Sequence, residues 1–318
     1  MSQSHLIQTT GLKKYFSTPK GQLHAVDDIN LTIDKRTTLG VVGESGCGKS
    51  TLGRVMIRLI PATGGQVFYN EQDLLRLSQS ELKEMRKKLQ IIFQDPYASL
   101  NPRMTVSAII EEPMIVCGIG TDHKERTERV DYLMKLVGLS SRLRNAYPHE
   151  LDGGRRQRIG IARALTVNPE FIVCDEPVSS LDVSIQAQIL NLLMSLQDTM
   201  GLTYMFITHD LSVVRHLSTN IMVMYLGQCV EYTSGPLLFQ NPLHPYTKAL
   251  LSAIPRPSIK PEHRMKSIII GEVTDPVNPK PGCRFAPRCS YVTKRCSDAD
   301  VPVVKAEDGH EVKCVLYC

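Results

Sequence analysis

The sequence lacks long apolar runs. No stretch of its 318 residues approaches the roughly 18–20 consecutive apolar residues of a membrane-spanning helix. The first residues, MSQSHLIQTTGLKKYF, also lack the long apolar run of a secretion signal. We therefore expect a protein that stays in the cytosol, since its apolar fraction of 42% and charged fraction of 22% are those of an ordinary soluble globular protein.

A strong charge bias is missing as well. The net charge of +5 fits a protein that handles polyphosphate or lies near anionic lipid, but an ordinary soluble enzyme would look the same. The length allows one large domain or two. Disulfides are disfavoured despite the nine cysteines, because the cytosol is reducing.

Apolar segments that alternate with amphipathic ones predict an α/β fold. The expected strands lie at 25–33, 38–43, 66–70, 171–176 and 204–210. The expected helices lie at 49–60, 70–90, 122–145 and 184–199. Strands alternating with helices imply a mainly parallel sheet that is covered on both faces. From about Ile254 the sequence becomes rich in proline, which suggests an extended linker or arm.

The segment Gly43–Ser50 matches the phosphate-loop pattern G-x-x-x-x-G-K-[ST]. Its glycines let backbone N–H groups point at phosphate oxygens, and the positive end of the following helix adds to their attraction. Lys49 would bind the β- and γ-phosphates of ATP, and the Ser50 hydroxyl would bind Mg²⁺. The sequence contains no second loop of this kind, so the catalytic unit is not duplicated. The residues expected to contact nucleotide here are Gly43, Glu44, Ser45, Gly46, Cys47, Gly48, Lys49, Ser50 and Thr51.

A carboxylate pair follows the apolar strand FIVCDE. Asp175 and Glu176 would lie at the carboxyl end of this strand, where open α/β sheets bind their ligands. We expect Asp175 to orient Mg²⁺ and Glu176 to orient or deprotonate the attacking water. Together with the phosphate loop, the pair predicts ATP hydrolysis.

Four more motifs follow in a characteristic order. They are Gln94 in IIFQDPYASLNP, the stretch YPHELDGGRRQRIGIARAL, SSLD at 179–182 and His209 in FITHD. In this order and spacing the sequence resembles the nucleotide-binding subunits of ABC transporters, from the first strands to about residue 240. The resemblance implies a P-loop ABC ATPase core, with a mixed, mainly parallel sheet and an antiparallel β subdomain. It divides the chain into an ATPase domain, residues 1–242, with a helical subdomain and signature at about 95–155, and a cysteine-rich extension, residues 243–318.

The resemblance also implies roles for single residues. Gln94 would approach Mg²⁺ and the lytic water, and His209 would contact the γ-phosphate. An aromatic residue near the N-terminus stacks on adenine in this family, and Phe16 aligns better for this than Tyr15. Family members act as head-to-tail pairs in which each ATP lies between one phosphate loop and the other chain's signature. The dimer seam would include Ser179, Ser180 and Asp182.

The signature departs from the family pattern L-S-G-G-Q. Here Asp152 replaces the serine, while Gly153 and Gly154 remain to let backbone N–H groups face the γ-phosphate. Two anions 4 Å apart repel by roughly 4 kcal/mol at an effective dielectric near 20. Arg155 adds a compensating cation, and Arg156 is a second candidate for this role. Either the ATP site that uses Asp152 is slower than its partner site, or the carboxylate is tolerated without penalty.

Three stretches narrow the subfamily: QDPYASLNPRMTV, CDEPVSSLDVSIQAQI and NPLHPYTKALLSAIP. They resemble the ATPases of dipeptide and oligopeptide importers, which include nickel and glutathione uptake systems, and specifically the second of two nonidentical ATPases. The implied partners are another ATPase subunit that is not identical to this one, two permeases and an extracytoplasmic binding protein, with no nucleic acid. The implied location is the cytoplasmic face of the membrane. A soluble ABC ATPase of DNA repair or translation is the alternative from another class, but the usual coiled-coil insertion or second ATPase unit is missing. A regulatory subunit that binds ATP without hydrolysing it is a third alternative.

The cysteines crowd the end of the chain. Cys283, Cys289, Cys296 and Cys314 supply four thiols, and Cys318 is a spare. Structural zinc sites usually show C-x2–4-C pairs, which this spacing lacks, whereas four cysteines suffice for a [4Fe–4S] cluster. The C-terminal extension of the resembled subfamily implies such a cluster, which would staple the arm. Zinc and unligated thiols remain as alternatives.

Overall fold

A computed structural model describes residues 5–120, 122–254, 271, 275–306 and 309–318. The chain forms two compact units. Unit 1 consists of Met1–Leu6, Ile33–Thr37 and Tyr69–Ile207. Unit 2 consists of Ile7–Thr32, Thr38–Phe68 and Thr208–Cys318. Each unit gathers segments that are distant in sequence, so the division at residues 242 and 243 stays a prediction.

Unit 1 contains a parallel three-stranded sheet in the order β8-β7-β6. The strands are β6 (Leu89–Ile92), β7 (Phe171–Asp175) and β8 (Thr203–Thr208). Every residue of β7 and β8 is buried, as expected for parallel strands covered on both faces. This burial explains why both strands are short, nearly continuous apolar runs in the sequence.

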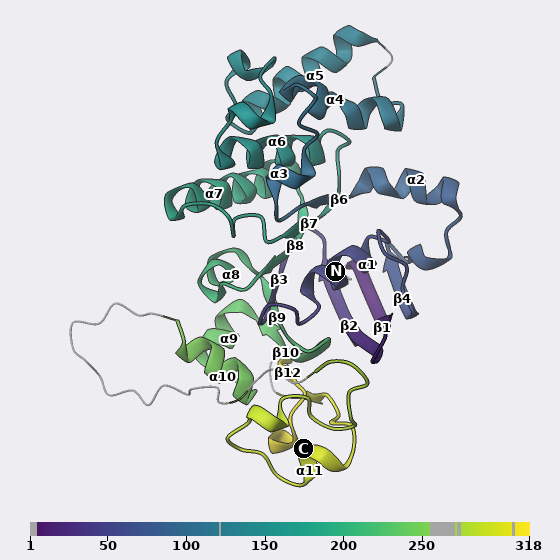
Figure 1. Cartoon of the computed structure of the whole chain (residues 1–318), viewed down its shortest axis with the longest axis vertical. Helices are drawn as coiled ribbons and strands as arrows, with labels where there is room; N and C mark the ends of the chain where they lie inside the picture. The colour runs from purple at the N-terminus through teal and green to yellow at the C-terminus, as the bar shows by residue number, and fades with distance from the viewer. Residues whose placement is uncertain (1–4, 121, 255–270, 272–274, 307–308) are drawn as a thin grey trace, which may run out of the picture. The chain divides into compact units, whose positions relative to one another are not determined.

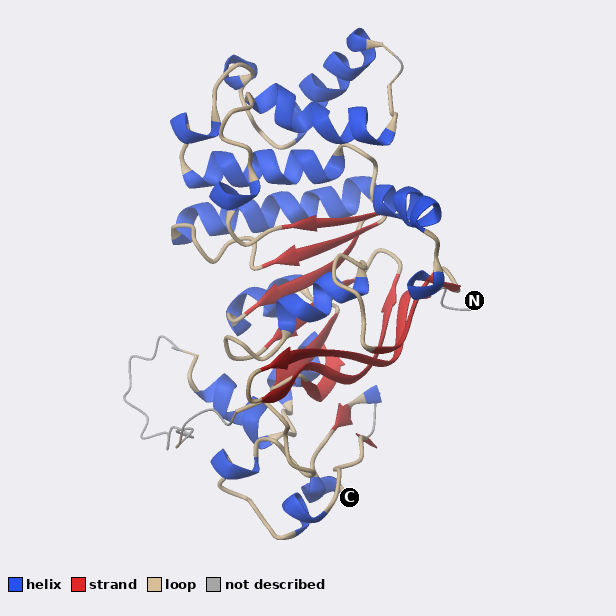
Figure 2. Cartoon of the chain, turned by 45° about the vertical axis from the view of Figure 1, so that its right-hand side comes forward, coloured by secondary structure: helices blue, strands red, loops and turns tan. Residues whose placement is uncertain are grey.

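The helices of unit 1 lie in layers beside this sheet (Figures 1 and 2). The longest is α7 (Val183–Met200), which contacts α6 (Gly153–Leu165), and α6 in turn contacts α4 (Val106–Cys117) and α5 (His123–Leu136). The remaining elements of the unit are β5 (Gln72–Asp73), η1 (Leu74–Arg76), α2 (Gln79–Lys88), α3 (Pro96–Ser99), η2 (Ser141–Leu143) and η3 (Pro148–Glu150). Residues 95–155, where a helical subdomain is expected, contain α3, α4 and α5 and reach the start of α6.

Unit 2 contains two sheets. The first joins three strands in the order β2-β1-β4, and the second runs β11-β12-β10-β9-β3. Parallel pairing of β3 with β9 and antiparallel pairing of β9 with β10 make the second sheet mixed, in agreement with the predicted fold class. The strands of unit 2 are β1 (His5–Thr18), β2 (Gly21–Asp34), β3 (Thr38–Val42), β4 (Gly64–Tyr69), β9 (Asn220–Tyr225), β10 (Gln228–Ser234), β11 (Val304–Lys305) and β12 (Glu311–Val312). Its helices are α1 (Lys49–Met56), α8 (Leu211–Leu217), α9 (Gly235–Gln240), α10 (Pro245–Ser252), η4 (Ala286–Arg288), α11 (Arg295–Asp298) and η6 (Val315–Tyr317).

The end of the chain is part of unit 2 rather than a tail. Strand β12 pairs with β10. The buried carboxylate of Glu231, on β10, also binds residues of the C-terminal extension. Glu231 accepts the backbone N–H groups of Leu243 and His244 at 2.7 and 2.8 Å, and its other contact is the ring Nε2 of His310 at 2.7 Å. A buried carboxylate is stable only when its oxygens are satisfied, so these contacts fix the extension to the sheet. Of the expected proline-rich arm, residues 255–263 lie outside the described residues.

Candidate functional site

The phosphate loop joins β3 to α1 within unit 2. Three of its glycines, Gly43, Gly46 and Gly48, have φ of +156°, +78° and +103°. A Cβ on Gly48 would lie 1.9 Å from the carbonyl oxygen of Ala25, so no other residue fits there. The loop therefore takes the glycine-dependent curl that the sequence pattern predicts.

Lys49 lies inside this curl. Its side chain is buried, and Nζ donates to the carbonyl oxygens of Gly43 and Glu44 at 2.8 and 2.9 Å. These carbonyls hold the ammonium group in the concave side of the loop, where the motif requires a cation for phosphate. Ser50 and Thr51 follow in the first turn of α1, whose N-cap is Gly48. Burial raises the pKa of the Cys47 thiol, which keeps it protonated beside the loop.

The carboxylates of the acidic site lie in unit 1. Asp175 is the last residue of β7 and is fully buried. Glu176 follows with φ of +47°, and its backbone N–H donates to the carbonyl of Ile207 at 3.0 Å. The amide Nε2 of Gln94 donates to Oε2 of Glu176 at 3.1 Å. Two side chains that are 82 residues apart thus meet, and both are residues that we expect near the attacking water.

The signature loop of unit 1 shows how Asp152 is accommodated. Asp152 is the N-cap of α6: its Oδ1 accepts the Arg155 N–H at 2.8 Å, and its Oδ2 lies 3.4 Å from Arg155 Nε. The carboxylate therefore has the compensating cation expected from Arg155. Arg156, the second candidate, makes other contacts: its Nε donates to the Pro148 carbonyl at 2.7 Å, and its guanidinium covers the ring of Tyr97. Gly154 is buried, and Gly153 is half-buried.

The remaining predicted residues are divided between the units. In unit 1, the Ser179 hydroxyl donates to the Glu176 carbonyl at 3.1 Å, while Ser180 and Asp182 are exposed. In unit 2, His209 is exposed directly after β8. The two adenine candidates also lie there, on strand β1. The Tyr15 ring stacks on His24 with centroids 3.8 Å apart, and its hydroxyl donates to Asp27.

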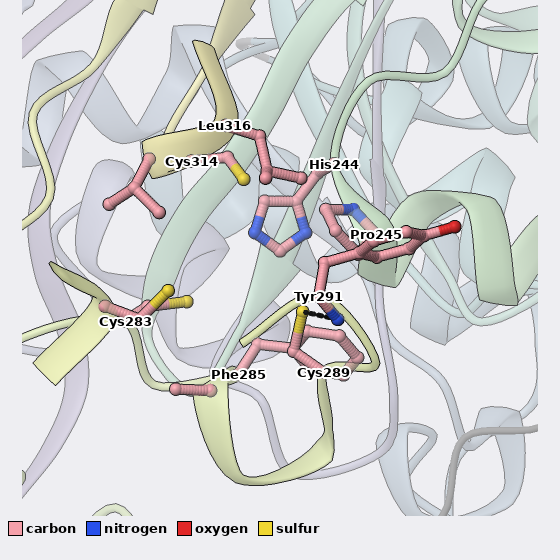
Figure 3. Close-up of a pocket in the computed structure, with 11 residues that line it drawn as sticks. His244, Pro245, Cys283, Phe285, Cys289, Tyr291, Cys314 and Leu316 are labelled. Carbon is pink, nitrogen blue, oxygen red and sulfur yellow. Dashed lines mark hydrogen bonds between the residues drawn. The ribbon is translucent and has the colours of Figure 1, made fainter. Parts of the chain in front are cut away.

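The C-terminal cysteines gather at a pocket of unit 2 (Figure 3). Cys283, Cys289, Cys296 and Cys314 all line it, whereas Cys318 does not. Burial raises the pKa of the Cys283 thiol to about 11, and all nine cysteines, each in the described part of the chain, are free of disulfides. No three His, Cys, Asp or Glu side chains among the described residues lie close enough to hold one metal ion.

Sequence reasoning missed His244 at the same pocket. His244 is 1% exposed, and its ring reaches among the cysteines in Figure 3. The ring Nδ1 accepts the backbone N–H of Tyr246 at 3.1 Å, so Nε2 carries the hydrogen. No described residue accepts a hydrogen bond from that Nε2–H. Burial lowers the pKa of His244 to about 3, so the ring is neutral at pH 7.

Comparisons with known proteins identify the family of the chain. The family model "ABC transporter" matches residues 26–179, and "Oligopeptide/dipeptide transporter, C-terminal region" matches residues 230–296. The oligopeptide transport ATP-binding protein AppF of Bacillus subtilis is 48% identical, over 99% of this chain and 98% of that protein. The dipeptide transport ATP-binding protein DppF of Haemophilus influenzae is 47% identical, over 97% of this chain and 96% of that protein. The ATP-binding cassette MJ0796, solved as a dimer bound to ADP and Pi after hydrolysis, is 29% identical, with a TM-score of 0.66 over 72% of this chain and 98% of that one.

The phosphate loop, the acidic strand end and the cassette-like fold define an ABC-type ATPase that is coupled to transport. More narrowly, the chain belongs to the family of ATP-binding proteins of oligopeptide and dipeptide ABC transporters. Membership implies ATP and Mg²⁺ as cofactors, ATPase dimerisation and membrane permeases as partners. Across the described residues, no helix combines the length and apolar character needed to cross a membrane.

Proposed function

We propose that this chain powers the import of dipeptides or oligopeptides by hydrolysing ATP at the cytoplasmic face of a membrane. The supporting observation is the similarity to peptide-transport ATPases over nearly the whole chain, including the C-terminal region matched at residues 230–296. The phosphate-loop core is common to every ABC ATPase and does not distinguish substrates. The assignment of peptides as the substrate class therefore rests on the C-terminal match.

The test is uptake by the assembled transporter. The chain, its two permeases, the second ATPase and the binding protein would be reconstituted in vesicles and supplied with labelled peptides, Ni²⁺ or glutathione. We expect ATP-dependent uptake of peptides. Uptake of Ni²⁺ or glutathione alone would replace the peptide assignment with one of those alternatives.

Hydrolysis is proposed to follow from positioning and electrostatic stabilisation rather than covalent catalysis. Lys49 and the loop N–H groups would bind the phosphates, and Ser50 with Asp175 would hold Mg²⁺. Glu176 would orient or deprotonate the water while the Gln94 amide, 3.1 Å from its carboxylate, holds that carboxylate in place. His209 would contact the γ-phosphate. Phe16 is the proposed adenine contact, because side chains alternate along a strand and the Tyr15 hydroxyl is already bonded to Asp27.

The proposed dimer is asymmetric. This chain would pair with a nonidentical ATPase, and its phosphate loop and Glu176 would work with the partner's signature, while the site that uses Asp152 would be slower. A heterodimer with Glu176→Gln in this chain tests the assignment, and the matching change in the partner is the control. We expect the first change to lower turnover more. Turnover that survives the change in this chain but not the change in the partner would contradict the proposal.

The cysteine pocket is proposed to hold a [4Fe–4S] cluster. Four thiols surround one space without converging on a single point, which suits a cluster that gives each thiolate its own iron better than it suits one zinc ion. The orphaned Nε2–H of His244 also fits, because a cluster offers sulfur acceptors to a buried donor that otherwise loses a hydrogen bond. Bound there, the cluster would supply covalent cross-links; the chain's own residues would orient the four thiols and exclude water.

Anaerobic purification of the full chain tests the cluster. We expect stoichiometric iron and sulfide and the visible absorption of an iron–sulfur chromophore. Cys318→Ser is the matched control, since Cys318 lies outside the pocket lining and its substitution should leave the iron content unchanged. Zinc in place of iron, or no metal at all, would contradict the proposal.

A further inference from the structure

The phosphate loop is in direct contact with the cysteine-bearing segment of unit 2. Arg288 immediately precedes Cys289, yet its guanidinium reaches Glu44, the second residue of the loop. Nη1 lies 2.8 Å from Oε2 and Nη2 lies 3.1 Å from Oε1, so the pair is bidentate. The Arg288 side chain is 8% exposed and that of Glu44 26%, so water screens the pair only in part. The Arg288 guanidinium also donates to the Tyr225 hydroxyl at 3.3 Å.

The backbone of Glu44 is held by the same part of the chain. Its N–H donates to the hydroxyl of Tyr246 at 2.8 Å. Tyr246 is fully buried, and its ring packs against Tyr225 and Phe285, with centroids 4.8 and 5.3 Å away. Phe285 lies between Cys283 and Arg288, so one rigid aromatic cluster supports both contacts to the loop.

Glu44 in turn accepts hydrogen bonds from two other residues of the loop. Its carbonyl oxygen accepts a hydrogen bond from Lys49 Nζ at 2.9 Å and lies 3.3 Å from the Cys47 backbone nitrogen, which donates to it. A shift of Glu44 therefore moves both the Lys49 cation and the backbone of Cys47, to which its carbonyl oxygen is bonded. Bidentate guanidinium–carboxylate pairs fix direction as well as distance, which makes Arg288 suited to hold this residue.

We propose that Arg288 is a positioning residue of the nucleotide site: through Glu44, the C-terminal extension sets the conformation and the nucleotide affinity of the phosphate loop. The extension is then a working part of the ATPase rather than an appendage to it. This role goes beyond the proposed transport function and needs neither a particular substrate nor an occupied cysteine pocket.

The test compares the affinity of the full-length chain for Mg·ADP among matched variants. Arg288→Ala should weaken binding about tenfold, which corresponds to about 1.4 kcal/mol. Arg288→Lys keeps the charge but loses the fork and should recover part of the affinity. Arg295→Ala, an exposed arginine on the same segment, is the control and should bind as the unchanged chain does.

A double-mutant cycle separates positioning from general damage. Glu44→Gln alone should weaken ADP binding, but it should add little on the Arg288→Ala background, because the two side chains act as one pair. In the assembled complex, KM for ATP should rise while kcat at saturating ATP stays within about twofold. If Arg288→Ala does not fold, as judged by its thermal unfolding, Arg288→Lys and Glu44→Gln carry the test. Unchanged ADP affinity in folded variants, or fully additive effects in the cycle, would overturn the proposal. Failure of peptide uptake would leave these binding results as they are.

Discussion

The phosphate loop and the cysteine pocket are both regions of unit 2, and both depend on the same backbone feature. Gly48 in the loop and Gly282 beside Cys283 each have φ of +103°. A Cβ on either would meet a carbonyl oxygen, that of Ala25 at 1.9 Å or that of Cys296 at 2.3 Å. The loop was nevertheless predicted in full from the sequence, whereas the four cysteines of the pocket were predicted and its other lining residues were not. The difference is that the loop is contiguous and made of backbone, whereas the pocket is lined by side chains between His244 and Leu316.

The largest expected effect is that of Lys49→Ala, which should impair the phosphate loop and leave the cysteine pocket intact. Lys49→Ala removes the buried cation of the loop, so Mg·ADP affinity should fall about 100-fold or more and hydrolysis by the assembled complex should become undetectable. The iron content of the same variant should stay unchanged, because Lys49 is not part of the cysteine pocket. Isothermal titration and iron analysis of one preparation measure both. Loss of iron together with nucleotide would show that the regions are not separable.

The second prediction concerns a change in the cysteine pocket and its effect on the phosphate loop. Cys283→Ser should lower the iron content to a small fraction of that in the unchanged chain, since a cluster needs all four thiolates. Mg·ADP affinity should fall only about threefold, because Arg288 reaches Glu44 from the segment that Cys283 anchors. Cys117→Ser is the control for cysteine loss elsewhere in the chain. A drop in ADP affinity as large as that of Lys49→Ala would contradict the indirect link.

The third prediction concerns the shared glycine feature. Gly282→Ala forces a Cβ against backbone at a strained φ and should lower the free energy of unfolding by about 2–4 kcal/mol. Gly309→Ala is the control: its φ is +70°, but among the described residues no atom lies within 4 Å of the added Cβ, so about 1 kcal/mol is expected. Chemical unfolding of the full chain checks both. Equal losses for the two variants would mean that the close approach at Gly282 has no energetic weight.

Sequence predicted the parts of the molecule that depend on local chemistry. The strands at FIVCDE and YMFITHD, the helix over 184–199, and the curl at Gly43–Ser50 were predicted correctly because apolar periodicity and glycine spacing are local signals. The expected helix over 122–145 is shorter in the structure, where α5 ends at Leu136, and α4 was not predicted.

Long-range contacts left no local signal. Nothing near Glu44 predicts an arginine 244 residues away, and nothing near Cys283 predicts His244 at the same pocket. The hydrogen bond between Gln94 and Glu176 was not predicted either; the resemblance implied only that Gln94 would approach Mg²⁺ and the lytic water. Contacts of this kind follow from sheet order and from the docking of the extension through Glu231, which only the folded chain displays.

The smallest expected effect is that of substituting Asp152 in unit 1. This residue has a local role as a helix cap and a proposed long-range role at the ATP site of the partner. As the N-cap of α6 it stabilises the helix through the Arg155 N–H, a role that serine fills equally well. Asp152→Ser should therefore leave the unfolding free energy within about 0.5 kcal/mol, whereas Asp152→Ala should cost about 1 kcal/mol.

Turnover separates the two explanations of this departure from the family pattern. If the carboxylate repels the γ-phosphate bound by the partner's loop, Asp152→Ser should raise hydrolysis by the heterodimer about two- to threefold, with Arg155 limiting the gain by screening the charge. The measurement uses a heterodimer whose other site is silenced by Glu176→Gln, so that only the site completed by Asp152 is observed. Unchanged turnover in Asp152→Ser would mean that Arg155 neutralises the carboxylate fully. Asp152 would then not make the two ATP sites unequal.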